Sequence, residues 1–329
     1  MPVKISVIIV NYNGVRYLAR CLDALAQQTF SDYEVILVDN ASKDDSVAFI
    51  RRAYPSVCLI ESPENLGFGG GNNLGLTVAK GAYIALLNND AFPEPDWLRH
   101  LLSGMESDPR IGICASKLVR DGSGLIDSAG DGCLTHAKGY KRGEHRSVAG
   151  YNQPEWIFGA CAGAALYRRA MIDDIGFFDE DFFLIHEDTD LNFRAQLFGW
   201  SCFYVPMAVV QHAVSGSIVE ESDLSIYYNN RNCDFVWIKN MPLPLLLRYL
   251  HHKILAELSA ILFFGLRKKR FRLFCKAKMG MLRLLPEMLR KRRQIQAARK
   301  IPIRDLAQML VPPWSKEYTQ SRWQRLFGS

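Results

Sequence analysis

Short apolar runs alternate with amphipathic segments through the first 90 residues of the chain. Apolar, β-branched runs bounded by turn residues predict buried strands, and apolar residues three or four positions apart predict helices. The predicted strands cover 5–12, 33–40, 57–62 and 82–90, and the predicted helices between them cover 15–28, 44–54 and 69–81. Because continuously apolar strands alternate with helices, we expect an α/β fold whose mostly parallel sheet is covered on both faces.

The pattern becomes less regular after residue 110 and mainly helical after about residue 225. Glycines in 124–143 predict a hairpin and loop. The segment 156–176 is predicted to form a strand followed by a helix, and 187–199 a further helix. We therefore divide the chain into an α/β domain, 1–220, and a C-terminal helical extension, 221–329.

Polar residues stand where three of the predicted strands end. They are Asn11, Tyr12 and Asn13 after the first strand, Asp39 and Asn40 after the second, and Asn88, Asn89 and Asp90 after the fourth. The carboxyl ends of parallel strands meet at one edge of a sheet, which is where ligands bind in open α/β sheets. We therefore expect these side chains to line a ligand crevice.

Two common phosphate-binding motifs do not occur at this edge. NYNG follows the first strand in place of a dinucleotide fingerprint, and NLGFGGGNNLG (65–75) follows the third strand without the lysine of a P-loop. The remaining interpretation is a nucleotide held by the strand ends, with a metal bridging its diphosphate. Asp90 offers Mg²⁺ or Mn²⁺ a hard oxygen ligand, or else caps the next element. His212 is either a second ligand, better suited to Mn²⁺, or a structural histidine.

The stretch LIHEDTDLNFR (184–194) places three carboxylates within four positions, directly after an apolar, aromatic run. Like charges this close repel one another, and burying them is costly unless something pairs with them. A solvated helix N-terminus also favours acidic residues, so the stretch has a purely structural interpretation. Asp190 and Arg194 are four positions apart, which predicts an ion pair on a helix surface.

Charge is distributed unevenly along the chain. The net charge is +6, yet residues 1–240 carry ten more acidic than basic residues and residues 241–304 carry +15. The apolar stretch ILFFGL is followed directly by Arg267-Lys268-Lys269-Arg270. Basic helices with an apolar face bind the interface of anionic membranes. The alternative is that these helices pack on the rest of the chain or on a second subunit, so the oligomeric state stays open.

Cysteine usage and the N-terminus bear on the compartment. None of the eight cysteines has CxxC spacing, so neither a zinc site nor a disulfide framework is expected. MPVKISVIIVNYNG lacks the apolar stretch and cleavage site of a signal peptide. No run reaches the ~18 apolar residues of a membrane-spanning helix. We expect a cytoplasmic protein that lies on the cytoplasmic face of the inner membrane.

Six segments occur in an order that resembles a known family: SVIIVNYN, VDNASKDDS, NLGFGGGNN, LLNND, IGFFDEDFFLIHEDTDL and His212. The chain resembles the family 2 inverting glycosyltransferases, above all the rhamnosyltransferase-like members that build bacterial surface polysaccharides. The resemblance covers about residues 4–217. It implies the GT-A fold of nucleotide-diphospho-sugar transferases, a Rossmann-like, mostly parallel sheet.

The resemblance also implies roles for individual residues. Asp90 corresponds to the metal-binding Asp at the strand end, and His212 to a histidine that is a metal ligand in several members. Asp188 corresponds to the catalytic base, and Glu187 beside it is expected to contact acceptor hydroxyls or the backbone. The expected donor-binding residues are those of the strand ends and the glycine-rich segment, with Arg231 as a phosphate-binding cation: Asn11, Tyr12, Asn13, Asp39, Asn65, Asn72, Asn88, Asn89 and Arg231.

The chain departs from the family pattern in two places. Asn89 stands where many relatives have proline, although the metal-binding Asp90 is retained. The Q-x-x-R-W motif of processive synthases does not occur, because TQSRW has Thr319 where glutamine is required. The resemblance therefore implies transfer of one sugar rather than polymerisation.

The expected activity is inverting transfer from a nucleoside-diphosphate sugar, with dTDP-rhamnose implied by the resemblance, to a glycan or lipid-linked glycan. A sugar nucleotidyltransferase would need a basic phosphate loop after the first strand, where only Arg16 is cationic. A non-catalytic nucleotide-sugar-binding protein would lack the acids, yet Asp90 and Asp188 are present. Nucleic acid is not expected as a partner, because the basic helices are too apolar.

Overall fold

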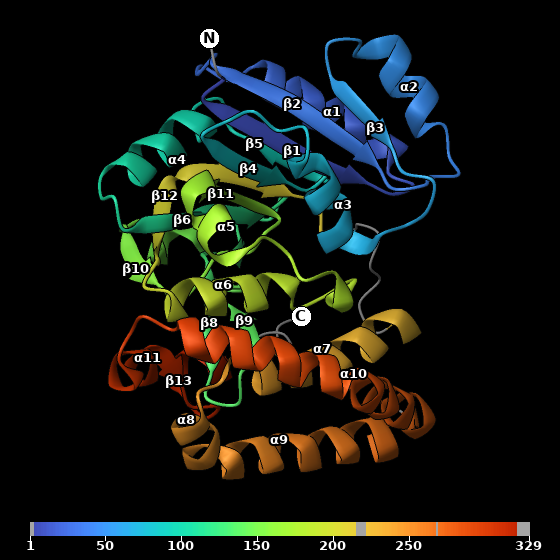
Figure 1. Cartoon of the computed structure of the whole chain (residues 1–329). Helices are drawn as coiled ribbons and strands as arrows, with labels where there is room; N and C mark the ends of the chain where they lie inside the picture. The colour runs from blue at the N-terminus through green and yellow to red at the C-terminus, as the bar shows by residue number, and fades with distance from the viewer. Residues whose placement is uncertain (1–2, 215–221, 268, 321–329) are drawn as a thin grey trace.

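The computed structural model describes residues 3–214, 222–267 and 269–320. An α/β unit lies above a layer of helices in Figure 1, and the chain passes from the first part to the second after β12. The predicted fold class is confirmed: a central, mostly parallel sheet is combined with a helical C-terminal region.

The first four strands form the parallel half of the sheet. They are β1 (Ile5–Asn11), β2 (Tyr33–Asp39), β3 (Cys58–Glu61) and β4 (Tyr83–Leu87), and β1 lies between β2 and β4. The predicted fourth strand is too long, because β4 ends at Leu87. Asn88, Asn89 and Asp90 therefore form a turn that leads into the short strand β5 (Ala91–Pro93).

The other half of the sheet is mixed. It contains β6 (Ile111–Arg120), β7 (Ile126–Ser128), β10 (Glu155–Ile157), β11 (Ala164–Arg168) and β12 (Ser201–His212). β11 runs antiparallel to both β4 and β6, whereas β12 runs parallel to β6 and pairs with β5 near its end. This pairing brings His212 next to the turn that carries Asp90.

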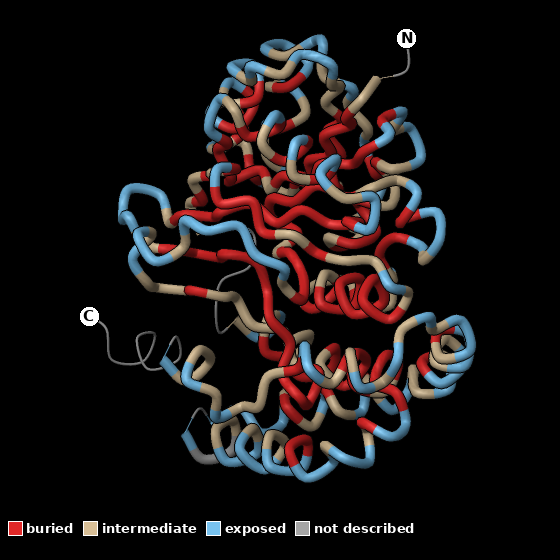
Figure 2. The backbone as a smooth tube through the Cα atoms, turned by 90° about the vertical axis from the view of Figure 1, so that its left-hand side faces the viewer, coloured by how far each residue is buried: buried red, intermediate tan, exposed pale blue. Residues whose placement is uncertain are grey.

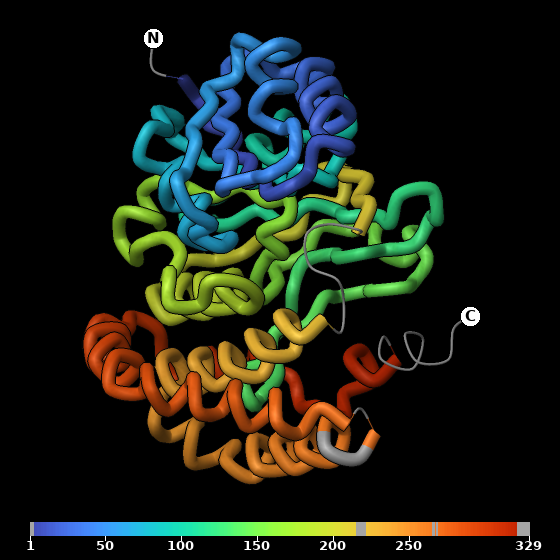
Figure 3. The backbone as a smooth tube through the Cα atoms, turned by 90° about the vertical axis from the view of Figure 1, so that its right-hand side faces the viewer, coloured from blue at the N-terminus to red at the C-terminus, as the bar shows by residue number. Residues whose placement is uncertain are grey.

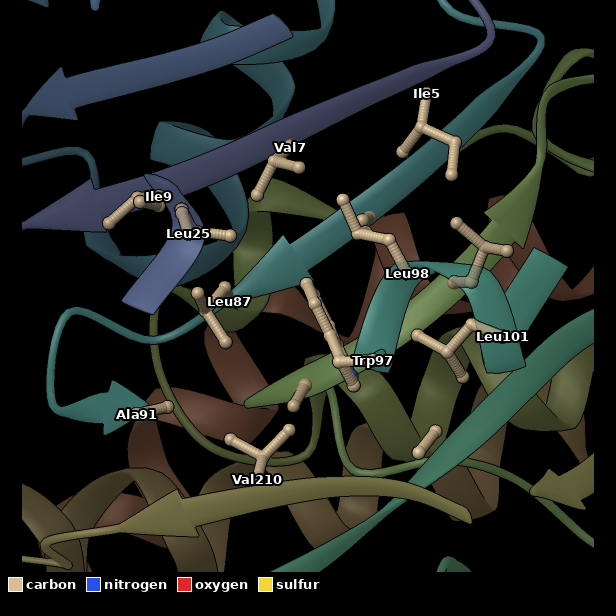
Figure 4. Packing of buried hydrophobic residues seen from close by; sticks show 14 of the residues in the cluster. Ile5, Val7, Ile9, Leu25, Leu87, Ala91, Trp97, Leu98, Leu101 and Val210 are labelled. Atoms are coloured by element: carbon tan, nitrogen blue, oxygen red, sulfur yellow. The ribbon is translucent and has the colours of Figure 1, made fainter. Parts of the chain in front are cut away.

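Helices cover both faces of the sheet, as the alternating pattern predicts. They are α1 (Val15–Ala26), α2 (Ser46–Ala53), α3 (Gly67–Leu76), α4 (Trp97–Glu106), α5 (Arg169–Ile175) and α6 (Glu187–Leu197). Successive strand side chains point to opposite faces. Val7 and Ile9 therefore join the cluster under α1 and α4, where Trp97 is fully buried, and Ile8 joins the cluster on the other face. Figure 4 shows the first of these clusters.

The helical layer comprises α7 (Asp223–Asn240), α8 (Leu243–Arg248), α9 (Leu250–Leu262), α10 (Phe271–Ala298) and α11 (Ile303–Met309). A third hydrophobic cluster joins Phe182 and Phe193 of the α/β unit to Phe235 of α7 and Met288 of α10. Figure 2 shows buried segments in the sheet, in α6 and on the inner side of this layer. The two predicted parts thus share a core, and the boundary at 220 stays a proposal. Within the described ranges, no helix has the length and apolar character needed to cross a membrane.

A small second sheet ties the end of the chain to its middle. The predicted hairpin is formed by β8 (Asp131–Leu134) and β9 (Gly139–Lys141), and β13 (Leu310–Val311) pairs in parallel with β8. The hairpin extends from the α/β unit into the helical layer (Figures 1 and 3).

An ion network at the junction of α6 and α7 corrects one expectation. Asp190 does pair with Arg194, at 2.9 Å, but both side chains are buried instead of lying on a helix surface. Lys239 of α7 contacts Asp190 at 2.7 Å and Asp179 at 2.5 Å. Arg194 also donates to the carbonyls of Ile175 and Gly176. Asp190 thus balances two buried cations at the point where the two parts of the chain meet.

Asp190→Asn should destabilise the fold strongly, because it leaves Arg194 and Lys239 buried with less negative charge. Removing one partner from a buried ion pair typically costs about 3–5 kcal/mol. Glu61→Gln is the control, since it breaks the exposed Arg51–Glu61 pair, which is worth about 1 kcal/mol or less. Urea unfolding measures the free energy of unfolding of each variant. Equal losses in the two variants would contradict the prediction that the fold depends strongly on Asp190.

Candidate active site

The polar residues after β1, β2 and β4 converge, as the parallel register requires. The Asn11 amide donates to the Asp39 carboxylate at 3.1 Å, and the Asn89 amide donates to Asn11 Oδ1 at 2.8 Å. The second oxygen of Asp39 accepts from the backbone N–H of Ser42 at 2.9 Å. Asp39 is thereby held in one orientation at the edge of the sheet, where the donor nucleoside is expected.

The other predicted donor-binding residues differ in their surroundings. Asn13 has a left-handed φ of 53° and its Oδ1 accepts from the backbone N–H of Lys43, while Tyr12 beside it is partly exposed. Asn65 Oδ1 accepts from the Asn40 amide at 3.0 Å. These side chains join the loops around the crevice, and their donor contacts stay predictions.

Two further predicted residues, Asn72 and Asn88, each donate a hydrogen bond to a backbone carbonyl. The Asn72 amide donates to the carbonyl of Phe68 within α3 and is buried. The backbone N–H of Asn88 donates to the carbonyl of Gly163, which links the end of β4 to the segment before β11. Neither contact tests donor binding.

Asp90 and His212 lie together, joined by two residues that the sequence pattern did not single out. His212 Nε2 is 3.2 Å from Asp90 Oδ1, and His212 Nδ1 is 2.9 Å from Asp127 Oδ2. Lys141 of β9 donates to both oxygens of Asp127 at 2.9 Å. A continuous row of buried or partly buried charged groups thus runs from Asp90 through His212 and Asp127 to Lys141.

This row shifts the protonation of its members. Burial by itself favours the neutral imidazole, but hydrogen bonds to Asp127 and Asp90 and their charges raise the pKa of His212 to about 9. Burial likewise opposes the ionisation of Asp127, but the charges of Lys141 and His212 hold its pKa below its usual range. Asp127 is therefore a carboxylate that fixes the His212 ring.

The donor set fits a divalent cation. A carboxylate oxygen of Asp90 and a ring nitrogen of His212 converge; both atom types bind Mn²⁺, and His212 would lose the proton on its Nε2 when a metal binds. Metal-bound histidines usually donate their other N–H to a carboxylate, and Asp127 stands at that position. Asp90 and His212 are thus the residues that would hold a metal, and Asp127 would orient the imidazole.

Asp188 lies in the first turn of α6 beside a second group of acids. Its carboxylate accepts from the backbone N–H of Thr189 at 2.6 Å. Ligand atoms of Asp131, Cys161 and Asp188 lie within 4.8 Å of one another. Burial raises the pKa of the Cys161 thiol well above its usual range, so in the absence of a metal this thiol is neutral.

The acids of this group hold protons more tightly than usual. Removal from water raises the pKa of Asp188, although the backbone N–H groups of Thr189 and Ala162 act in the opposite direction. Burial, and then the charge of Asp188, raise the pKa of Asp131 well above its usual range. Lys141 is the partner of Asp131 across the β8–β9 hairpin, and Asp188 lies beside Asp131, so both carboxyl groups lie next to the row that ends at that lysine.

Glu187 is buried, and among the described residues its Oε2 has no hydrogen-bond partner. Burial, followed by the charge of Asp188, raises the pKa of Glu187 well above its usual range. A buried oxygen without a partner is available to a ligand hydroxyl. The expected contact of Glu187 with an acceptor stays a prediction.

Arg231 has partners other than those expected. Its guanidinium is buried and donates to the carbonyls of Asp181 and Phe182 at 2.5 and 3.0 Å, and its Nε donates to Asn232 Oδ1. The rings of Tyr228 and Phe235 lie against it. Arg231 is thus a buried arginine, and these contacts do not orient its guanidinium toward a phosphate. Its donor-binding role stays a prediction without support from them.

The glycine-rich segment approaches the loop before α6. Gly67 has a φ of +73°, and a Cβ there would lie 2.2 Å from the carbonyl oxygen of Phe183. The next residue, Phe68, donates its backbone N–H to the same oxygen at 2.8 Å. Only glycine permits this approach, so the segment packs against the Asp188 loop instead of forming a P-loop.

Comparison with known proteins identifies the family. The family model described as "Glycosyl transferase family 2" matches residues 6–176. The chain belongs to glycosyltransferase family 2. This match confirms the resemblance found in the sequence, and Asp188 and His212 lie beyond the matched residues.

Curated relatives of family 2 are similar over part of their length. An uncharacterized glycosyltransferase of Nostoc sp. is 31% identical over 177 residues, which are 52% of this chain and 53% of that protein. N-acetylglucosaminyl-diphospho-decaprenol L-rhamnosyltransferase of Mycobacterium tuberculosis is 28% identical over 239 residues, 63% of this chain and 75% of that protein. The chain therefore spans about half of the first relative and three quarters of the second.

Solved structures show the same fold. The mannosyltransferase PcManGT of Pyrobaculum calidifontis, in complex with GDP-Man and Mn²⁺, has a TM-score of 0.53 and 17% identity. The likeness covers 99% of this chain and 88% of that one. It supports the GT-A fold, including the helical region that follows β12.

Asp127, Asp131 and Lys141 were missed because the signal for them is not local. Asp127 meets His212 only because β7 and β12 both pair with β6. Lys141 meets Asp127 because the β8–β9 hairpin folds back on this edge. The one local signal was an acid within the short apolar segment LIDSAG, which is unusual unless a partner is present.

Proposed function

We propose that the protein transfers a single sugar from a nucleoside-diphosphate sugar to an acceptor hydroxyl, with inversion at the anomeric carbon. The observation that carries this proposal is the row from Asp90 through His212, Asp127 and Lys141, which ends beside Asp188. It supplies a metal-binding pair and a carboxylate base within one site. Membership of family 2 supports the reaction class.

The donor we propose is dTDP-L-rhamnose and the acceptor a lipid-linked diphosphate sugar. The Mycobacterium relative is named as an L-rhamnosyltransferase acting on such a lipid. A panel of sugar nucleotides, incubated with the protein and Mn²⁺, tests the donor, because slow hydrolysis to free nucleoside diphosphate identifies a bound sugar nucleotide. The proposal would be contradicted if no sugar nucleotide in the panel were hydrolysed and no sugar were transferred to a lipid-linked acceptor.

The geometry suggests how the residues divide the work. The acceptor oxygen attacks the anomeric carbon as the bond to the diphosphate breaks, and the hydroxyl proton passes to a carboxylate oxygen of Asp188. The bond-pair electrons leave with the nucleoside diphosphate. A divalent cation held by Asp90 and His212 would neutralise this leaving group. Asp39 and Asn11 hold the nucleoside end at the neighbouring strand ends.

Asp188→Asn should retain donor binding and lose transfer by about 100-fold or more, because the amide cannot accept the proton. Calorimetry with the donor and a transfer assay separate the two effects. Asp174→Asn is the control, since Asp174 pairs with Lys300 at a partly exposed position near the C-terminal end of α6, the end opposite Asp188. Transfer by Asp188→Asn at a tenth of the wild-type rate or better would exclude Asp188 as the base.

The same base sets the acid side of the pH profile. Asp188 must be ionised to accept a proton, and its pKa is raised. The rate should therefore fall as the pH is lowered through that raised pKa, at a higher pH than an ordinary Asp would give.

Asp90→Ala should weaken donor binding and abolish the response to Mn²⁺, with a smaller effect in the same direction for His212→Ala. Asp127→Asn should lower Mn²⁺ affinity by about 10- to 100-fold, because the imidazole loses the carboxylate that orients it. Electron paramagnetic resonance of free Mn²⁺ measures this affinity directly, without turnover. Asp121→Asn, which removes a surface partner of Arg20, is the control. Full activity in EDTA would remove the metal from the mechanism.

The acceptor proposal includes an anionic membrane surface as a partner. The outward side of α9 presents an apolar stripe whose exposed members are Leu250, Ile254, Leu255, Leu258, Ile261 and Leu262. α9 lies at the lower edge of the molecule in Figure 1, far from the sheet. Its only acid, Glu257, pairs with Lys253 and Lys278. Exposed Arg248, Arg267 and Arg272 flank the stripe in the sequence.

These features fit a surface that lies on anionic lipid. Each Lys or Arg close to such a membrane adds about 1 kcal/mol of attraction. A peripheral position of this kind places the protein on the membrane leaflet that carries a lipid-linked acceptor.

Liposome flotation checks the membrane proposal. The protein should float with vesicles containing phosphatidylglycerol at low salt and dissociate at high salt. Ile254→Gln with Leu258→Gln should weaken binding on the order of ten-fold, because two apolar contacts are lost. Val78→Gln with Met207→Gln, at exposed apolar positions of the α/β unit, is the matched control. If the intact protein stays soluble at low salt, the α9 stripe is a packing or oligomerisation surface.

A further inference from the structure

The loop directly before Asp188 has an unusual backbone. Phe183, Ile185 and His186 have φ values of 62°, 67° and 71°. Phe183 also has a ψ of −62°, and the N–H of Leu184 donates to the carbonyl of Phe182 at 2.7 Å. This is a γ-turn of the rare, strained hand. Non-glycine residues keep such conformations only where the surroundings over-determine them.

Asn232 of α7 provides that constraint on one side of the loop. Its Nδ2 lies 2.9, 2.6 and 2.7 Å from the carbonyl oxygens of Phe182, Leu184 and Ile185. Its Oδ1 accepts from Arg231 Nε at 2.8 Å. Because a guanidinium is only a donor, this bond sets the amide orientation and directs the NH₂ group at the loop.

Neighbouring residues of α7 hold the two ends of the same loop. Arg231 donates to the carbonyls of Asp181 and Phe182, and Asn229 Oδ1 is 3.0 Å from His186 Nε2. The remaining carbonyl, that of Phe183, accepts from Phe68 of α3. The loop is therefore held between the glycine-rich segment and α7.

We propose that Asn232, oriented by Arg231, is a positioning residue for the catalytic base. It holds residues 182–186 in the strained turn from which α6 starts, and so sets the position of the Asp188 carboxylate. Asn232 is fully buried and touches no substrate. This proposal rests on the proposed role of Asp188 as the base.

Release of these carbonyls would let the loop relax to a less strained backbone. His186 is the residue before α6, so a change in its φ moves the first turn of that helix. A displacement of about 1 Å at a reacting group can lower a rate by about 100-fold. Donor and metal binding should be spared, because Asp39, Asp90 and His212 lie on other elements.

Asn232→Asp is the sharpest variant. It keeps the size of the side chain and the acceptor for Arg231, but replaces the NH₂ group with an oxygen that faces three carbonyl oxygens. Asn230→Asp is the matched control, because Asn230 is also buried on α7 and, among the described residues, its amide bonds only to Ile226 of the same helix. Hydrolysis of dTDP-L-rhamnose with Mn²⁺ provides the kinetic assay.

For Asn232→Asp we expect kcat to fall by about 10- to 100-fold with KM for the donor within about two-fold of the wild type. Asn230→Asp should keep both values within about three-fold. Hydrogen exchange of the amides in 183–190, followed by mass spectrometry, should be faster in Asn232→Asp and unchanged in Asn230→Asp. A purely structural role would instead affect both variants alike or spread the faster exchange over the whole chain.

A second variant and the exchange measurement keep the proposal testable if Asn232→Asp does not fold or the enzyme shows no activity. If Asn232→Asp does not fold, Asn229→Ala removes only the contact with His186 at a partly exposed position and should lower kcat by about three-fold or more, with faster exchange in 183–190. Normal kcat and normal hydrogen exchange in folded Asn232→Asp, or in Asn229→Ala where Asn232→Asp does not fold, would overturn the proposal. If the wild type hydrolyses no sugar nucleotide, the proposed function fails, and exchange alone then decides whether Asn232 holds the loop.

Discussion

The charge balance around Asp190 is the interaction on which the arrangement of the site depends. Asp190 meets Arg194 of its own helix and Lys239 of α7 in a region closed to water. If any of the three side chains moved away, the charges that remain would be buried without a partner. The distance between α6 and α7 is therefore fixed. That distance allows Asn232 to reach the loop before Asp188, while Lys291 of α10 binds Asp179 and Asp181 on the other side of the loop.

The acids of the site fall into two groups according to their partners. Asp127 faces Lys141 and His212, and its pKa is lowered. Within the part of the chain that the structure describes, Glu187 and Asp131 have no cation in hydrogen-bond contact, and their pKa values are raised by burial and by the charge of Asp188. Paired carboxylates stay ionised and orient their neighbours, whereas those without a cation hold protons more readily. The acid proposed to orient the metal ligand, Asp127, belongs to the first group, and the proposed base, Asp188, lies among the acids of the second.

The sequence predicted what depends on local pattern. Strands β1 to β4, helix α6 and the convergence of Asn11 and Asp39 follow from periodicity and from the geometry of parallel strands. Asp90 and His212 were put forward as metal ligands from residue type and position, and the family resemblance implied the same roles. The pairing of Asp127 with Lys141 and the contacts of Arg231 depend on which distant strands and helices become neighbours, which no local pattern records. The Asp190–Arg194 pair was predicted from spacing alone, and its burial was missed because α7 covers it.

The late position of α7 in the chain affects when the protein acquires its working shape during synthesis. The whole central sheet has been synthesised once His212 has been made, yet the γ-turn at Phe183 lacks its contacts with α7 until Asn232 follows. Lys291 and the strand at Leu310 come later still. At about 5–20 residues per second, the α/β unit waits several seconds without them. The nascent chain therefore has the strand ends of the sheet in place before the loop that precedes Asp188 is held by α7.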